Sequence, residues 1–264
     1  FPRRCRESVM RYIADWEKMT ERMGFWVDLD DAYYTLDNHY IESVWQLLKI
    51  IWDKELIYQD YKVVPYDPRI GATLSSHEVA QGYREVEDPS VTLRFRLADD
   101  VRTSFLVWTT TPWTLPSNLA LAVGEDIDYV YVDRQGETLI LAEALLHAVL
   151  GDGDHRIVRR VKGRDLVGLG YQRLFDHLAA EGDICRVHAG EFVSTDDGTG
   201  IVHVAPAYGV DDLELGQRNQ LPVVHGVGLD GYFKPEVTPV AGLFFKDADP
   251  IIVELLQEKG LLFK

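Results

Sequence analysis

Cysteine is scarce in this sequence, with only Cys5 and Cys185 among 264 residues. Two cysteines so far apart argue against a disulfide framework and fit a reducing compartment. A signal peptide and an apolar run of membrane-spanning length are also missing. We therefore expect a cytoplasmic protein with no membrane partner. The chain begins at Phe1 rather than Met and leads directly into a charged helical pattern, so we expect a fragment of a longer protein.

Basic residues are also in short supply. The chain has 27 Lys and Arg against 43 Asp and Glu, a net charge of −16. Proteins that bind nucleic acid are usually basic, because they contact its phosphates. Any contact with nucleic acid must therefore be local, and the clearest basic cluster contains Arg159, Arg160, Lys162 and Arg164. The alternative is that this cluster is only a solvated loop.

Several catalytic and metal-binding motifs are absent. There is no Gly-x-Ser-x-Gly, no reactive cysteine next to a histidine, no Cys-x-x-Cys and no His-Glu-x-x-His. No glycine-rich phosphate loop opens a helix. These absences argue against a serine or cysteine hydrolase triad, a zinc site and a P-loop.

The first third of the chain has a helical pattern. Apolar residues recur every three or four positions from Val9 to Met23, and Gly24 is suited to end the helix. A second helix is expected after a cap at Asp37 and Asn38, with Trp45 and Trp52 on its apolar face. We expect the tryptophans of both helices to pack in a core.

The pattern changes near residue 91 to short runs rich in β-branched and aromatic residues. We expect strands at 91–97, 104–110, 129–132, 138–141, 156–161 and 200–205. Many short strands between turn signals favour a β-barrel or sandwich. Helices are expected at 143–150, near 175–180 and at the C-terminal end.

In that last helix, Asp249 is the candidate N-cap, Pro250 suits the first helical position and Gly260 suits the stop. The predicted class is therefore α+β, a β-barrel or sandwich with decorating helices, preceded by a helical segment; the family resemblance described below implies the β-barrel-rich form. The composition shift at Asp88–Pro89 predicts two parts, 1–88 and 89–264.

The densest group of hydroxyls lies at the end of a predicted strand. Thr109, Thr110 and Thr111 put successive hydroxyls on alternating faces, and Pro112 ends the strand because it has no N–H to donate. Such a corner can hold a carbonyl, a water or the edge of a base. The alternative is a strand whose threonines only satisfy β-propensity.

A second cluster contains His203 and two aspartates. His203 shares a strand face with Ile201 and the small Ala205, which leaves space beside the ring, although a histidine on an apolar strand is more often a satisfied core residue. Asp211 followed by Glu214 has the spacing of a capping box, so Asp211 is the expected N-cap. Asp212 then lies in the first turn, where the helix dipole favours its ionised form. The alternative is that both aspartates merely begin a helix.

Together, these two clusters resemble the editing domains of isoleucyl-tRNA synthetases. Residues 108–118, Trp-Thr-Thr-Thr-Pro-Trp-Thr-Leu-Pro-Ser-Asn, are similar to their threonine-rich signature, and residues 198–212 to their second signature. Valyl and leucyl enzymes tend to carry Thr-Thr-Arg-Pro at the first motif. The likeness covers nearly the whole chain, since residues 6–9, 42–45 and 74–78 resemble the synthetase body and the stalk before the insertion.

The resemblance implies a hydrolase that removes valine misattached to isoleucine tRNA, with the tRNA 3′ end and the rest of the synthetase as partners and no cofactor for editing. It leaves open whether valyl-adenylate is cleaved as well. Asp212 is implied to bind the α-ammonium, and His203 to contact the substrate and limit its size. The residues implied to line the pocket and orient the attacking water are Thr109, Thr110 and Thr111, with Trp113 beside them and Asn118 as a nearby polar contact.

Two departures from the family bear on function. Many relatives have Cys-x-x-Cys where this chain has Asp67 and Ile70, so we expect no metal there. The His-Ile-Gly-His and Lys-Met-Ser-Lys-Ser motifs of the synthetic site are absent, so this chain should not activate isoleucine. The alternatives are a valyl- or leucyl-type editing domain, or a non-catalytic module that binds the tRNA 3′ end.

Overall fold

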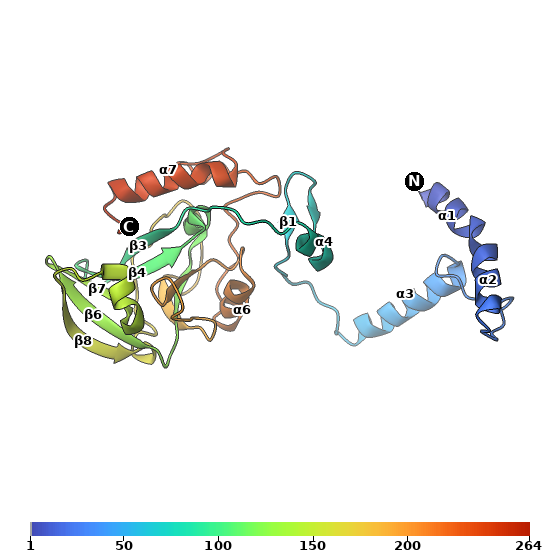
Figure 1. Ribbon diagram of the computed structural model, residues 1–264, viewed down its shortest axis with the longest axis horizontal. Helices are drawn as coiled ribbons and strands as arrows, with labels where there is room; N and C mark the ends of the chain where they lie inside the picture. Colours follow the sequence, from blue (N-terminus) through green and yellow to red (C-terminus); the bar gives the residue numbers. More distant parts are fainter. Residues whose placement is uncertain (1) are drawn as a thin grey trace. The chain divides into compact units, whose positions relative to one another are not determined.

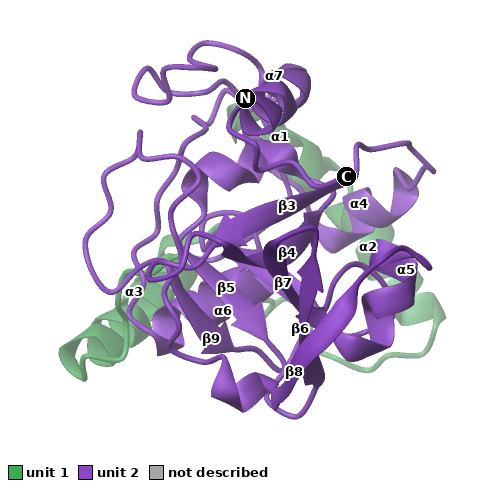
Figure 2. Ribbon diagram, turned by 90° about the vertical axis from the view of Figure 1, so that its left-hand side faces the viewer, with its two compact units in different colours: residues 1–61 green, residues 62–264 purple. Residues whose placement is uncertain are grey.

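The computed structural model describes residues 2–264 and divides the chain into two compact units, Phe1–Tyr61 and Lys62–Lys264 (Figure 2). The short segment 62–88 groups with the second unit. The functional division after residue 88 stays a prediction. None of the helices within residues 2–264 combines the length and apolar character that a membrane span requires.

The first unit is helical, as the sequence predicts. It contains α1 (Pro2–Arg11), α2 (Ile13–Arg22) and α3 (Asn38–Asp53), and Asp37 is the N-cap of α3 (Figure 1). The expected core packing of the tryptophans is wrong for this structure. Trp16, Trp45 and Trp52 are 64%, 67% and 60% exposed, and none of the three helices buries a residue. Their apolar faces have no covering layer within the unit.

The second unit is a mixture of sheets and helices, which confirms the predicted class. Its elements begin with β1 (Tyr66–Asp67), β2 (Ala72–Thr73) and α4 (Ser76–Gln81). Next come β3 (Val91–Arg96), β4 (Thr103–Thr109), the 3-10 helix η1 (Pro112–Ser117), β5 (Ala120–Val123), β6 (Asp128–Arg134), β7 (Glu137–Ala142), η2 (Glu143–Leu145), α5 (Leu146–Leu150) and β8 (Arg156–Lys162). The last elements are η3 (Gly163–Asp165), β9 (Arg186–Ala189), β10 (Ile201–Val204), α6 (Val210–Arg218) and α7 (Phe245–Glu258).

The strands form three sheets. The largest has the order β3-β4-β7-β6-β8, the second β10-β5-β9, and β1 pairs only with β2. The β6–β7 hairpin turns through Gln135 and Gly136, whose φ angles of 53° and 88° are those of a type I′ turn. The expected barrel does not close. The outer edge of β3 instead accepts the C-terminal segment, with Thr92 N–H donating to the Lys264 carbonyl at 2.8 Å.

The six predicted strands are present, but β1, β2, β5 and β9 were not predicted. β5 reads Ala-Leu-Ala-Val and is buried along its whole length between β10 and β9. Alanine has little β-propensity, so nothing local marks this strand. The helix expected near 175–180 is wrong, because that segment is irregular. It buries Phe175 and Leu178 in the core, and the Leu178 carbonyl accepts from the Arg173 side chain at 2.7 Å.

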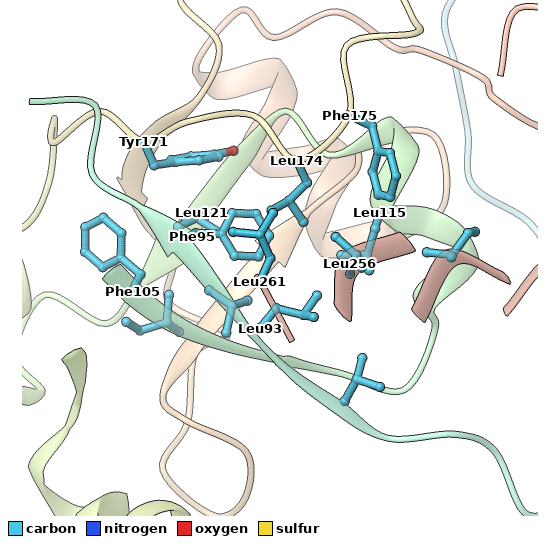
Figure 3. Packing of buried hydrophobic residues seen from close by; sticks show 14 of the residues in the cluster. Leu93, Phe95, Phe105, Leu115, Leu121, Tyr171, Leu174, Phe175, Leu256 and Leu261 are labelled. Carbon is cyan, nitrogen blue, oxygen red and sulfur yellow. The ribbon is translucent and has the colours of Figure 1, made fainter. Parts of the chain in front are cut away.

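The predicted start of the last helix is wrong, whereas the predicted stop is confirmed, because Gly260 follows the C-cap Lys259 with a φ of 67°. α7 begins at Phe245, four residues before Asp249, so that Asp249 and Pro250 lie inside the helix. Ala248, Ile252 and Leu256 of α7 are buried in the main core, which explains why the helix starts early. Figure 3 shows part of this core and labels Leu93, Phe95, Phe105, Leu115, Leu121, Tyr171, Leu174, Phe175, Leu256 and Leu261.

Candidate functional site

The threonine-rich segment forms a corner between a strand and a 3-10 helix. β4 ends at Thr109, and η1 begins at Pro112, which occupies the first helical position. The Thr111 N–H donates to the Thr109 hydroxyl at 3.1 Å. Thr109 is buried, Thr110 is exposed and Thr111 is half-buried. The predicted alternation of hydroxyls and the break at Pro112 are therefore confirmed.

A chain of hydroxyls leads from this corner to His203. The Thr111 hydroxyl lies 3.2 Å from that of Thr109 and 3.3 Å from that of Thr114. The Thr114 hydroxyl lies 2.9 Å from Nε2 of His203, which is on β10. Thr111 and Thr114 are three residues apart, the spacing that places side chains over one another in a 3-10 helix.

The hydrogen bond to Thr114 fixes the orientation of the His203 ring. The other ring nitrogen, Nδ1, is buried without a hydrogen-bond partner among the described atoms. Burial lowers the pKa of His203 to about 4. The ring is therefore neutral near pH 7.

Asp212 is held at the start of α6. Its Oδ1 accepts a hydrogen from the Ala205 N–H at 2.6 Å. Its carboxylate also packs over Gly209, where a Cβ atom would lie 2.0 Å from Oδ2. Burial raises the pKa of Asp212 above its usual value, and the hydrogen bond from Ala205 opposes that rise.

The predicted N-cap at Asp211 is wrong. Gly209 is the N-cap of α6, so Asp211 and Asp212 are both first-turn residues. The lack of a side chain at Gly209 lets the Asp212 carboxylate turn back over the cap. Asp211 is exposed.

All the predicted site residues except Asn118 line one cavity of about 300 Å³. These residues are Thr109, Thr110, Thr111, Trp113, His203 and Asp212, and the cavity also touches Trp108, Thr114, Val202, Ala205, Tyr208 and Gly209. Asn118 lies elsewhere and is 1% exposed. Its Nδ2 donates to the Ala120 carbonyl at 2.9 Å, and its Oδ1 accepts from the Tyr171 hydroxyl at 2.6 Å. Asn118 therefore makes its hydrogen bonds within the protein.

Sequence reasoning missed three residues at this site. Thr114 lies within the signature, but only the 3-10 geometry shows that it faces His203. Tyr208 packs its ring edge-on against Trp113, with 4.9 Å between centroids, and its hydroxyl accepts from the N–H groups of Gly226 and Val227. The third is Asp249, whose Oδ1 accepts from the Trp113 N–H at 2.8 Å. Nothing in the local sequence connects Tyr208 or Asp249 to the corner.

The basic cluster is matched by carboxylates. Arg160 pairs with Glu143 at 2.9 Å, Lys162 with Asp128 at 2.8 Å, and Arg164 with Asp126. The Arg159 guanidinium lies 5.4 Å from the centre of the Tyr131 ring. These pairs favour the interpretation of the cluster as a solvated surface.

Within residues 2–264, no group of three or more histidines, cysteines, aspartates or glutamates could hold a metal ion. At Asp67, Oδ1 accepts from the Arg69 N–H at 2.8 Å and closes a turn. The carboxylate there stabilises the loop backbone.

Comparison with known proteins identifies the family. Residues 1–237 match the family model described as tRNA synthetases class I (I, L, M and V). The chain belongs to the class I tRNA synthetases. This synthetase chain is 48% identical to the isoleucine–tRNA ligase of Clostridium kluyveri over 264 residues, which are 100% of the chain and 25% of that relative. The isoleucine–tRNA ligase of Thermobifida fusca is also 48% identical, over 267 residues, with the same coverage. The synthetase chain thus spans a quarter of the length of these relatives.

A solved structure supports the fold of the second unit. The editing domain of the P. knowlesi cytosolic leucyl-tRNA synthetase matches with a TM-score of 0.53 at 13% identity, covering 68% of this synthetase chain and 97% of that domain. At that identity the match bears on the fold alone. The synthetase chain therefore contains an editing-domain fold.

Proposed function

We propose that this chain is the editing part of an isoleucyl-type synthetase and hydrolyses valine misattached to isoleucine tRNA. The observation that carries the proposal is the convergence of the threonine corner, His203 and Asp212 on one cavity of about 300 Å³. The relatives named isoleucine–tRNA ligase support isoleucine as the cognate amino acid in this proposal. The tRNA 3′ end is the partner, and valyl-adenylate is a second substrate to test.

The hydrolysis needs an ammonium site, a place for a water and a polarised ester carbonyl. Asp212, when ionised, binds the α-ammonium of the misattached valine. Hydroxyls and backbone groups of Thr109, Thr110 and Thr111 hold the ester and the water. The water attacks the ester carbonyl, the ester C–O bond breaks, and the terminal ribose hydroxyl leaves with a proton.

The source of base catalysis follows from the titratable groups. His203 and Asp212 are the histidine and the carboxylate that line the cavity. With a pKa of about 4, His203 is a weak base. We assign activation of the water in part to the neighbouring ribose hydroxyl of the tRNA, and we assign no general base to the protein.

His203 has the role of a size filter in this proposal. A methylene group changes binding by only about 1–3 kcal/mol, and isoleucine against valine in this family is the standard example of that limit. A second site that admits valine and excludes isoleucine therefore needs a rigid wall. The His203 ring is 8% exposed and held by Thr114, so it suits that role.

The residues that precede the editing part have a separate role in the proposal. We assign residues 1–88 to the catalytic body and stalk of the synthetase, and residues 89–264 to editing. The exposed apolar faces of α1, α2 and α3 then pack against the rest of the synthetase chain. The proposed location is the cytoplasm, and editing requires no cofactor.

The test is a deacylation assay on the 264-residue chain. Isoleucine tRNA charged with valine should be hydrolysed, while the same tRNA charged with isoleucine and valine tRNA charged with valine should not. Preference for another mischarged tRNA would indicate a valyl- or leucyl-type domain. Binding of the tRNA 3′ end without hydrolysis of any of them would indicate a non-catalytic module.

A further inference from the structure

Asp249 joins the C-terminal helix to the threonine corner. It lies inside α7, is 3% exposed, and accepts a hydrogen from the Trp113 N–H at 2.8 Å across 136 residues of sequence. The Phe245 ring packs against the Trp113 ring with 4.7 Å between centroids. The start of α7 therefore holds Trp113 by its backbone and by its side chain.

The Trp113 N–H is a group that η1 itself leaves unpaired. The first N–H groups of a helix have no partner within it. Pro112 has no N–H, and the Thr114 N–H donates to the Thr111 carbonyl at 3.0 Å. Trp113 is left with the one N–H that needs an acceptor from outside. Asp249 supplies that acceptor.

The usual acceptor would be the hydroxyl of the N-cap residue. Thr111 is the N-cap of η1, and its side chain makes no cap hydrogen bond. Its hydroxyl instead lies among those of Thr109 and Thr114, on the wall of the cavity. Because Asp249 accepts from the Trp113 N–H, the Thr111 hydroxyl is released from capping.

We infer that Asp249 is a positioning residue for the proposed editing reaction, acting as an N-cap from a distant helix so that the Thr111 hydroxyl stays in the cavity. The inference rests on the proposed function and adds a residue outside both signatures. Asp249 does not touch the cavity and acts through Trp113 and Thr111.

Stability alone is a poor explanation for a carboxylate at this position. Ala248 and Ile252, its neighbours on α7, are buried apolar residues, so an apolar side chain would suit the core. Burying a carboxylate is costly unless its hydrogen bonds compensate. Lys246, the nearby cation on the same helix, bonds to Asp88 at 2.5 Å. Burial raises the pKa of Asp249, and the hydrogen bond from Trp113 and the charge of Lys246 oppose that rise.

The experiment compares Asp249→Ala with Asp249→Asn in the 264-residue chain. Asparagine keeps an oxygen acceptor without the charge, whereas alanine removes the acceptor. Leu139→Ala is the stability control, because Leu139 is fully buried in a separate cluster that does not line the cavity. Each rate of valine release from isoleucine tRNA is measured at saturating protein and corrected for folded fraction.

We expect Asp249→Ala to lower the saturated rate about 10- to 100-fold, as misplacing a group at the reaction site does. The protein concentration that gives half of the saturated rate should stay within about twofold of the parent's. Asp249→Asn should recover most of the rate, and Leu139→Ala should keep the parent rate per folded molecule. An Asp249→Ala rate no lower than that of Leu139→Ala overturns the inference. So does an Asp249→Asn rate as low as that of Asp249→Ala.

A second measurement does not depend on hydrolysis. The only Pro-Trp pair in the sequence is Pro112–Trp113, so ¹³C-carbonyl proline with ¹⁵N-tryptophan identifies the Trp113 amide among six tryptophans. Its hydrogen exchange should be at least about tenfold faster in Asp249→Ala than in the parent and Asp249→Asn. Equal exchange in all three overturns the capping role. If the parent protein releases no valine, the proposed function is refuted. The hydrogen exchange of the Trp113 amide still shows whether Asp249 caps η1.

Discussion

The Nε2 atom of His203 lies 2.9 Å from the Thr114 hydroxyl, so β10 and η1 share a hydrogen bond across 89 residues of sequence. This bond holds the His203 ring on one wall of the cavity. Because Thr114 also donates to the Thr111 carbonyl, the ring position is coupled to the threonine corner. The predictions below separate the roles of these groups in the proposed reaction.

Replacing His203 with alanine should weaken the size filter. Packing an extra methyl group into a filled pocket typically costs 1–3 kcal/mol, and removing the ring relieves that cost. We expect His203→Ala to release isoleucine from correctly charged isoleucine tRNA, with its rate relative to valine raised about tenfold or more. The measurement is the ratio of the two single-turnover rates, corrected for folded fraction by circular dichroism.

His188→Ala is the matched control, because His188 lies on β9 of the same sheet and does not line the cavity. Its ratio should equal that of the parent. An unchanged ratio in His203→Ala as well would remove His203 from the specificity role.

The charge of Asp212 can be tested apart from its hydrogen bond. Asp212→Asn keeps an oxygen that can accept from the Ala205 N–H, but it loses the negative charge for the ammonium. A hydrogen bond to a charged group is worth about 1.5–3 kcal/mol, so valine release should fall at least about tenfold with little loss of stability. The exposed Asp211 gives the control, since a first-turn carboxylate contributes only about 0.3–1 kcal/mol of stability. Equal rates for Asp212→Asn and Asp211→Asn would contradict the assignment.

The stability of the chain should depend on pH through His203. Its pKa in the folded state, about 4, is below the ordinary 6.5, so its contribution is complete above pH 6.5 and is lost as the pH falls towards 4. Between pH 7.5 and 4.5 we expect the free energy of unfolding to fall by roughly 2–3 kcal/mol from this residue alone. Urea unfolding of the parent and of His203→Gln at both pH values isolates the contribution, because other groups titrate alike in both. Equal pH dependence in the two proteins would show that His203 is not held neutral by burial.

Zinc should be neither bound nor needed. Asp67 and Ile70 offer no thiolate, and the Asp67 carboxylate bonds to its own turn. Structural zinc sites in proteins depend on thiolate and imidazole ligands. We expect less than stoichiometric zinc by elemental analysis, and full hydrolysis in the presence of a chelator. One zinc per chain, or loss of activity on chelation, would refute this.

Local features of the sequence were enough to predict six strands and the corner. Short runs rich in β-branched and aromatic residues mark β3, β4, β6 and β7, and Pro112 ends the strand pattern because it has no N–H to donate. β5 escaped prediction because its alanines carry no strand preference, and only its place between β10 and β9 makes it a strand. The segment 175–180 failed in the opposite way, since its core contacts replaced a helix that its composition favoured.

In the site, too, some features could be predicted from the sequence and others depend on tertiary packing. Two recognisable segments contain Thr109 to Thr111, His203 and Asp212, so the sequence alone predicts the residues that we assign to the substrate. Only the tertiary structure decided that Asn118 turns inward to Tyr171 and that Asp249 caps Trp113. The physical reason is that a side chain's partner is chosen by packing between distant elements. Burial of the first turns of α7 outweighs the local capping preference of Asp249. The helix therefore begins earlier, and the Asp249 carboxylate lies at the threonine corner.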